Sequence, residues 1–429
     1  MNWFIATATL EREPRPLIIL PFALLLLSIA LAPVILRHHW ERHYHKLCVV
    51  LAVLVCGYYI FALNAGARII HAGLDYFSFM VVVGSFFVVS GGIHLRVKGA
   101  ARPAANTLFL FGGALLAGII GTIGASMLLI RPWIATNRGR FAGMHLAFFI
   151  FVVSNVGGAL LPTGPPLFLG YLKGVPFFWN LMRCWPQWSV TLGLILLGFY
   201  VADQMNFRAA RKSVREKSMA SEKWSCDGSG NFIFMLAILS ALIVLPPGWR
   251  EAVMIVATLV SYWRTPRRIH QANAFSFAPI KEVGWLFLGI FGTMIPVLDY
   301  MELHAANLGL HSDLQFYWAA GVLSALLDNA PTYLTLLAGA LGLHGLDIDS
   351  AQQMSEFVRL HDHYLVAIAL GATCFGALTY IGNGPNLLVK AIAEQAKVPT
   401  PSFFGFAFKF AIPVLIPIFA LVSYLFFWT

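Results

Sequence analysis

The chain has 429 residues, of which 59% are hydrophobic and only 11% charged, and its mean hydropathy is +0.75. A soluble domain carries about 25% charged residues, so these values exclude a soluble globular protein, a disordered chain and a disulfide scaffold. The net charge of +10 is typical of basic residues collected in cytoplasmic loops, and no basic run alternates with exposed aromatic residues. We expect an all-α polytopic membrane protein that binds membrane lipid and no nucleic acid.

Ten apolar segments are candidate membrane spans, each of which needs about 20 residues. They lie near 16–36, 46–64, 76–95, 141–170, 187–204, 231–247, 252–263, 283–301, 363–389 and 405–428. The first segment has its basic flank after it rather than before it, unlike a signal peptide, so we expect a retained span. Two further apolar segments, 105–130 and 314–342, are interrupted by small and turn-forming residues.

The most polar long connection, 205–230, carries six lysines and arginines and divides the chain into halves of similar length. The positive-inside rule places this connection in the cytoplasm. We expect a first repeat at 1–204, a cytoplasmic linker at 205–230 and a second repeat at 231–429.

The two interrupted segments have flanks of matching charge. The flanks of 105–130 are basic and those of 314–342 are mostly acidic. Flanks of matching charge place both ends of a segment on the same side of the membrane. Such a segment enters and leaves on that side, so we expect two re-entrant hairpins. The first would enter from the cytoplasm, with its tip at 124–126, and the second from outside. The alternative is that both are ordinary spans.

With these hairpins, the second half repeats the first upside down, which is the inverted-repeat architecture of many secondary transporters. Each half also contains a glycine and proline cluster inside an apolar segment, at 141–170 and 363–389. The expected helix-breaking residues are Gly157, Gly158, Gly164, Pro165, Gly382, Gly384 and Pro385. Irregular backbone survives at membrane depth only where protein or a watered cavity satisfies it, so the clusters predict two broken helices at a binding site. A simple packing kink is the alternative.

The second hairpin carries an acid, Asp328, within the sequence Asp-Asn-Ala-Pro-Thr. An ionisable residue inside a membrane is a functional candidate by default, although Asp328 is also suited to cap the helix that follows. His145 and Asp203 lie near span ends and are expected at the membrane interface. The chain has no nucleotide-binding, nucleophile-elbow or HExxH motif, so we expect neither an enzyme nor a metal site.

Three segments carry a resemblance to a known family: SNVGGALLPTGPPLFLGYLKGVPFFW (154–179), LSALLDNAPTYL (323–334) and TYIGNGPNLLVKAIAE (379–394). The chain resembles the ion transporter superfamily of citrate–metal symporters, D-type sodium:proton antiporters and arsenite permeases. Its nearest branch is described either as citrate transport proteins or as sodium:proton antiporters.

The resemblance implies two inverted repeats, a scaffold that forms a homodimer, and a transport domain that moves like an elevator. Carried over by position, the residues on the family's site segments are Ser154, Asn155, Thr163, Asp328, Asn329, Thr332, Asn383 and Asn386. Relatives of this branch read Gly-Asp-Pro-Pro where Gly164 here is followed directly by Pro165 and Pro166. An acid that faces the site in those relatives is therefore absent.

These features predict a secondary active transporter of the bacterial cytoplasmic membrane. Asp328 is the one buried acid expected near the site, and a lone carboxylate suits a small cation. The sequence therefore favours sodium:proton antiport, with Na⁺ or H⁺ as coupling ion and no other cofactor. The alternative is a sodium- or proton-coupled citrate or carboxylate symporter. An uncoupled channel or a receptor would make little use of two matched broken helices.

Overall fold

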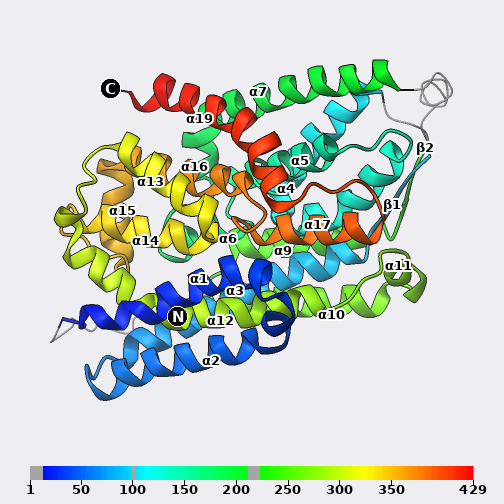
Figure 1. Cartoon of the computed structure of the whole chain (residues 1–429). Coiled ribbons are helices and arrows are strands. Elements are labelled where there is room, and N and C mark those ends of the chain that lie inside the picture. The colour runs from blue at the N-terminus through cyan, green and yellow to red at the C-terminus, as the bar shows by residue number, and fades with distance from the viewer. Residues whose placement is uncertain (1–12, 99–101, 211–222, 429) are drawn as a thin grey trace.

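The computed structural model describes residues 13–98, 102–210 and 223–428, and helices dominate them (Figure 1). Seven helices in these ranges are long and apolar enough to cross a membrane, which confirms the predicted class of all-α polytopic membrane protein. The elements of the first half are η1 (Pro16–Ile19), α1 (Leu20–Ile35), α2 (Arg37–Phe61), α3 (Gly66–Gly91), β1 (His94–Lys98), α4 (Pro103–Asn137), α5 (Gly143–Val152), η2 (Val156–Ala159), α6 (Pro165–Leu172) and α7 (Trp179–Ala209). Those of the second half are β2 (Lys223–Asp227), α9 (Asn231–Val244), α10 (Trp249–Arg264), α11 (Arg267–Ala272), α12 (Ala278–Leu303), η3 (Ala305–Leu308), α13 (Asp313–Leu326), α14 (Asn329–Gly342), α15 (Ala351–Leu360), α16 (Asp362–Phe375), η4 (Gly376–Leu378), α17 (Gly384–Gln395), α18 (Phe403–Phe406), η5 (Ala407–Ala411) and α19 (Ile412–Phe427).

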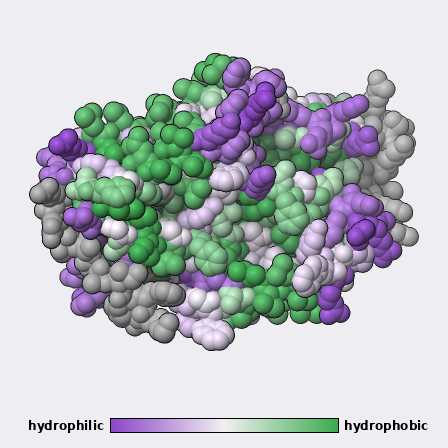
Figure 2. All heavy atoms as spheres, turned by 90° about the horizontal axis from the view of Figure 1, so that it is seen from below, coloured by the Kyte–Doolittle hydropathy of each residue, from purple (hydrophilic) through white to green (hydrophobic). Residues whose placement is uncertain are grey.

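The helices form two layers (Figure 1). The lower layer contains α1, α2, α3, α9, α10 and α12, and the upper layer contains α4 to α7, α13, α14, α16, α17 and α19. Within the lower layer, α12 packs closely on α2: a Cβ added at Gly292 would lie 2.6 Å from Cβ of Ala52. Small residues let membrane helices approach in this way. The face seen from below has broad apolar areas, as a surface in lipid requires (Figure 2).

Helix α4 is a hairpin rather than a straight helix. Its backbone leaves the helical region at Gly121, with φ 76° and ψ 156°, and Asn106 in the first arm donates a hydrogen bond of 2.8 Å to Asn137 at the end of the second. A left-handed φ favours glycine, which has no Cβ. The turn therefore lies at Gly121, and the tip expected at 124–126 is wrong because that stretch is already helical.

Helices α13 and α14 form a second hairpin in the upper layer. Ser312 caps α13 by accepting a hydrogen bond from the Gln315 main-chain N–H. The chain turns at Leu327 and Asp328, whose extended backbone separates the two helices. On which side of the membrane each hairpin opens stays a prediction, as does the division into two repeats.

Two helices are broken where glycine and proline clusters occur. In the first, α5 ends at Val152, η2 follows, and α6 begins at Pro165. In the second, α16 ends at Phe375 and α17 begins at Gly384. Proline at the first or second position of α6 and α17 has no N–H to satisfy and suits a helix start.

An antiparallel ribbon of β1 and β2 joins the two halves of the chain, with His94 opposite Asp227 and Lys98 opposite Lys223. The sequence predicted only a polar linker at 205–230. Instead α7 continues to Ala209 and residues 223–227 form a strand, while 211–222, which hold four of the six basic residues, lie outside the described residues.

Candidate functional site

The two helix breaks meet through three buried asparagines. Asn155, from the first break, donates a hydrogen bond of 2.9 Å to Oδ1 of Asn386. Asn383, from the second break, donates to Oδ1 of Asn155 at 3.1 Å and to the main-chain oxygen of Ser154 at 2.7 Å. All four residues are at most 1% exposed. The structure therefore brings together four of the residues predicted from the sequence.

The same side-chain amides satisfy carbonyls that the breaks leave without helical partners. Asn386 donates to the main-chain oxygens of Gly376 and Thr379, both at 2.9 Å. Asn155 donates to that of Ile150 at 2.8 Å. An unpaired buried carbonyl is costly, so these asparagines hold each break in its non-helical shape.

The tip of the α4 hairpin lies against the first break. Thr163 donates a hydrogen bond of 2.7 Å to the main-chain oxygen of Gly118, and the hydroxyls of Ser126 and Ser154 are 2.9 Å apart. A cavity of about 10 Å³ is lined by residues that include Gly121, Thr122 and Gly164. This is about the space that one water molecule needs.

Thr122 is a residue that sequence reasoning missed. It is 4% exposed, and its hydroxyl oxygen has no hydrogen-bond partner among the described residues. Since buried polar atoms are nearly always paired, this oxygen is available to a bound ion or water. The only sequence signal for Thr122 is the preceding residue, Gly121. Because α4 contains several other glycines, this signal does not single out Thr122.

The tip of the α13–α14 hairpin lies against the second break. Ser324 donates a hydrogen bond of 2.6 Å to the main-chain oxygen of Ala372, and Thr379 donates to that of Ala325 at 2.7 Å. Asn329, at the start of α14, is 1% exposed and its Oδ1 has no partner among the described residues. Each hairpin tip thus presents one buried, unpaired side-chain oxygen.

Asp328 acts as the N-cap of α14. Its Oδ1 accepts a hydrogen bond of 3.0 Å from the Ala330 N–H, and its main-chain oxygen accepts one of 3.0 Å from Thr332. The residue as a whole is half-buried, and its side chain makes no hydrogen bond to the three asparagines among the described residues. Asp328, Asn329 and Thr332 therefore form a separate group at the second hairpin.

Three other acids are buried in the fold, away from Asp328. Asp203, Asp299 and Glu251 are all at most 3% exposed. Asp203 pairs with Arg140, Asp299 with Arg68, and Glu251 with its neighbour Arg250. The partners of Asp203 and Asp299 are distant in the sequence, which therefore does not show them.

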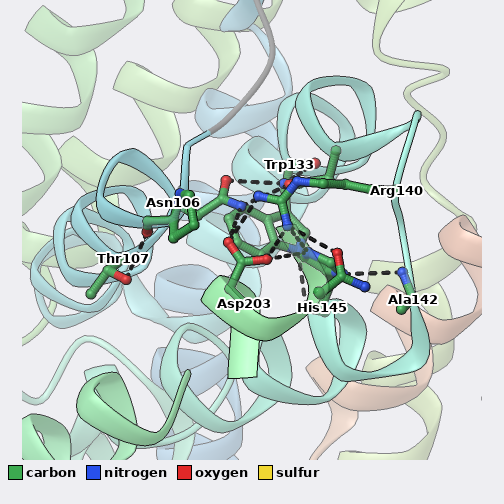
Figure 3. Close-up of polar contacts among 10 residues, drawn as sticks. Asn106, Thr107, Trp133, Arg140, Ala142, His145 and Asp203 are labelled. Carbon is green, nitrogen blue, oxygen red and sulfur yellow. Dashed lines mark hydrogen bonds and ion pairs between the residues drawn. The ribbon is translucent and has the colours of Figure 1, made fainter. Parts of the chain in front are cut away.

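The structure pairs Asp203 with His145, which the sequence places only near span ends. Figure 3 shows Asp203 of α7 surrounded by Asn106, Arg140 and His145. The Asp203 carboxylate accepts from Arg140 Nη2 at 2.9 Å and from Asn106 at 2.8 Å, and lies 3.0 Å from Nε2 of His145. Both His145 and Asp203 are fully buried. This cluster ties the base of the α4 hairpin to α5 and α7.

Four helices begin around the asparagines and the hairpin tips: the second arm of α4, α6, α14 and α17. Helix N-termini carry partial positive charge and attract anions. None of the hydrogen bonds and ion pairs around the candidate residues, in the described part of the chain, involves lysine or arginine. The site is thus built from amides, hydroxyls and helix ends, with one carboxylate at its edge.

Among the described residues, no group of three or more His, Cys, Asp or Glu side chains could hold a metal ion. No curated protein matches the chain. The family model described as "Putative citrate transport" matches residues 12–427. The chain therefore belongs to this family.

Proposed function

We propose that this member of the family is a secondary active transporter that moves a citrate-like carboxylate together with a cation. The observation that carries the proposal is that four helices begin at the two breaks and the two hairpin tips, where two buried oxygens, Thr122 Oγ1 and Asn329 Oδ1, have no partner among the described residues. In secondary transporters, the N-termini of broken helices face anionic substrate groups.

The proposal gives each kind of group a separate task. The helix ends at Gly164 and Gly384 stabilise the carboxylate groups of the substrate. The unpaired oxygens at the two hairpin tips bind cations, since hard cations are held by oxygen ligands. Cations bound next to a polyvalent anion reduce the cost of removing its charge from water, which couples the two movements.

The family match supports reversing the order of the two functions weighed from the sequence. Sodium:proton antiport was favoured on the premise of a lone buried carboxylate. Asp328 caps α14, whereas the family model that matches residues 12–427 is described as citrate transport, which supports a carboxylate substrate. Antiport stays the second candidate, because a half-buried carboxylate at a hairpin tip is suited to exchange a proton for a cation.

We assign the transporter to a bacterial cytoplasmic membrane and propose that it works as a homodimer. In the elevator movement that the family resemblance implies, the lower layer is the scaffold and the upper layer, with both breaks and both hairpins, is the moving part. The close packing of α2 on α12 supports a rigid scaffold.

Equilibrium binding tests this proposal. Purified protein is titrated with citrate in a sodium buffer and, as the control, in a choline buffer of equal ionic strength. We expect citrate to bind in sodium and at least tenfold more weakly in choline. Sodium binding with no citrate binding in either buffer would reject the carboxylate and favour antiport.

A further inference from the structure

A cluster of charges joins the two layers between the first part of α3, the end of α12 and the segment that connects α14 to α15. A cavity of about 30 Å³ lies between α3, α12 and α14, and the charged residues lining it are Arg68, Asp75, Lys173, Asp299 and Asp349. We call these five residues the outer cluster. The proposed transport function uses none of them.

The members come from both layers. Arg68 and Asp75 lie on α3 and Asp299 on α12, all in the lower layer. Lys173 directly follows α6, and Asp349 lies between α14 and α15, in the upper layer.

Lysine and arginine each bridge the layers. Nζ of Lys173 lies 2.8 Å from Asp75 across the boundary and 2.7 Å from Asp349 on its own side. Arg68 forms an ion pair with Asp299 on its own side and lies 3.4 Å from Asp349 across the boundary. The two contacts that cross are therefore Lys173–Asp75 and Arg68–Asp349.

The cluster is shielded from water. The side chains of Lys173 and Arg68 are 11% and 13% exposed, and that of Asp299 is fully buried. Tyr59 donates a hydrogen bond of 2.5 Å to Asp299, which fixes the acid that positions Arg68. Burial alone would raise the pKa of Asp349, but Lys173 and Arg68 hold that pKa below its usual value.

Sliding one layer past the other would separate both crossing pairs. Asp75 would then lose its basic partner in a poorly hydrated cavity, and Lys173 and Arg68 would each keep only one of their two acids. A buried unpaired charge is strongly destabilising. The layers can part only when water enters the cavity and hydrates these groups.

We propose that the outer cluster is an ionic latch that keeps the two layers closed at this point and must open in each transport cycle. The inference rests on the proposed function, because the latch restrains the movement of the transport cycle. It does not depend on the identity of the substrate. Lys173 is the central residue of the latch, because it holds one acid from each layer.

The latch is tested by the reactivity of a cysteine between the layers. Leu334 of α14 lines the cavity and is 1% exposed, so Leu334→Cys reacts with a thiol reagent only when the layers part. The five native cysteines are replaced, and the purified protein is placed in lipid nanodiscs, where the reagent reaches both sides. No substrate is needed.

We expect slow labelling of Leu334→Cys alone. Asp75→Asn or Lys173→Met should each accelerate labelling at least tenfold, which is about 1.4 kcal/mol in the opening equilibrium. The double variant, with Asp75→Asn and Lys173→Met, should label no faster than Lys173→Met alone. Either single change already removes the contact between Lys173 and Asp75. Lys173→Arg, which keeps the charge, and Glu356→Gln, which removes an exposed acid of α15, should stay near the parent rate.

Two results would overturn the latch: labelling at the parent rate in the Asp75 and Lys173 variants, or equal acceleration by Glu356→Gln. Size-exclusion profiles report folding. If Lys173→Met does not fold, Asp75→Asn carries the test, since it leaves Lys173 paired with Asp349. Faster labelling in a protein that binds no citrate would support the latch and reject the proposed substrate, so the two failures are distinguishable.

Discussion

The side-chain amide of Asn383 donates a hydrogen bond of 2.7 Å to the main-chain oxygen of Ser154, 229 residues earlier in the chain. This bond joins the second broken helix to the first at a point where neither is helical. It makes the two breaks one structural unit, so a substitution in either break should change the conformation of both.

The variant Asn383→Leu tests this unit. It leaves Oδ1 of Asn155 and the oxygen of Ser154 without the donor that they share, and an unsatisfied buried polar group costs about 1–3 kcal/mol. We expect lower thermal stability, measured by the loss of the monomer or dimer peak on heating, together with weaker citrate binding. The control is Asn307→Leu at an exposed position, and unchanged binding in Asn383→Leu would assign Asn383 to packing alone.

Thr122 and Thr163 allow the effect of losing a cation ligand to be distinguished from the effect of losing a structural hydrogen bond. The Thr122 hydroxyl has no partner among the described residues, whereas Thr163 donates to Gly118. Thr122→Val should therefore leave thermal stability unchanged or raised and increase the sodium concentration needed for half-maximal citrate binding at least tenfold. Thr163→Val should lower stability by about 0.5–1.5 kcal/mol, the net value of a hydrogen bond. Equal sodium dependence in Thr122→Val and the parent would exclude Thr122 as a ligand.

Gly121 makes the turn of the α4 hairpin possible. At φ 76° and ψ 156° an added Cβ would lie 2.6 Å from the main-chain oxygen of Thr163, and this backbone conformation costs residues other than glycine about 1–3 kcal/mol. Gly121→Ala should lower the thermal stability and weaken sodium-dependent citrate binding. Gly112→Ala, in the first arm with no atom near its added Cβ, is the matched control and should resemble the parent. Comparable behaviour of both variants would mean that the turn tolerates a side chain.

The inverted topology is tested by single cysteines in intact cells. Cysteines at Asn307 and Ser350, which flank the α13–α14 hairpin, should both react with an impermeant thiol reagent from outside. A cysteine at Thr136, near the end of the α4 hairpin, should react only after the membrane is made permeable. If Asn307 and Ser350 report opposite sides, the second hairpin is an ordinary span and the inverted repeat is wrong.

The broken helices and the asparagines near them could be predicted because glycine and proline clusters are local signals in an apolar segment. The turn at Gly121 could not, since α4 contains five glycines and only the contact with Thr163 distinguishes this one. The ribbon of β1 and β2 depends on pairing between residues more than 120 positions apart. The same reason hides the partners of Asp203 and Asp299, whose burial follows from Arg140 and Arg68 rather than from their neighbours in sequence.

The central claim is that a cation gradient moves a carboxylate through this protein. The most direct measurement places the purified protein in liposomes, imposes an inward sodium gradient, and follows both labelled citrate and the internal pH. We predict citrate uptake that depends on the gradient and is absent in empty liposomes, with no proton movement when citrate is left out. Proton movement driven by sodium alone, without any carboxylate present, would contradict the claim and establish sodium:proton antiport instead.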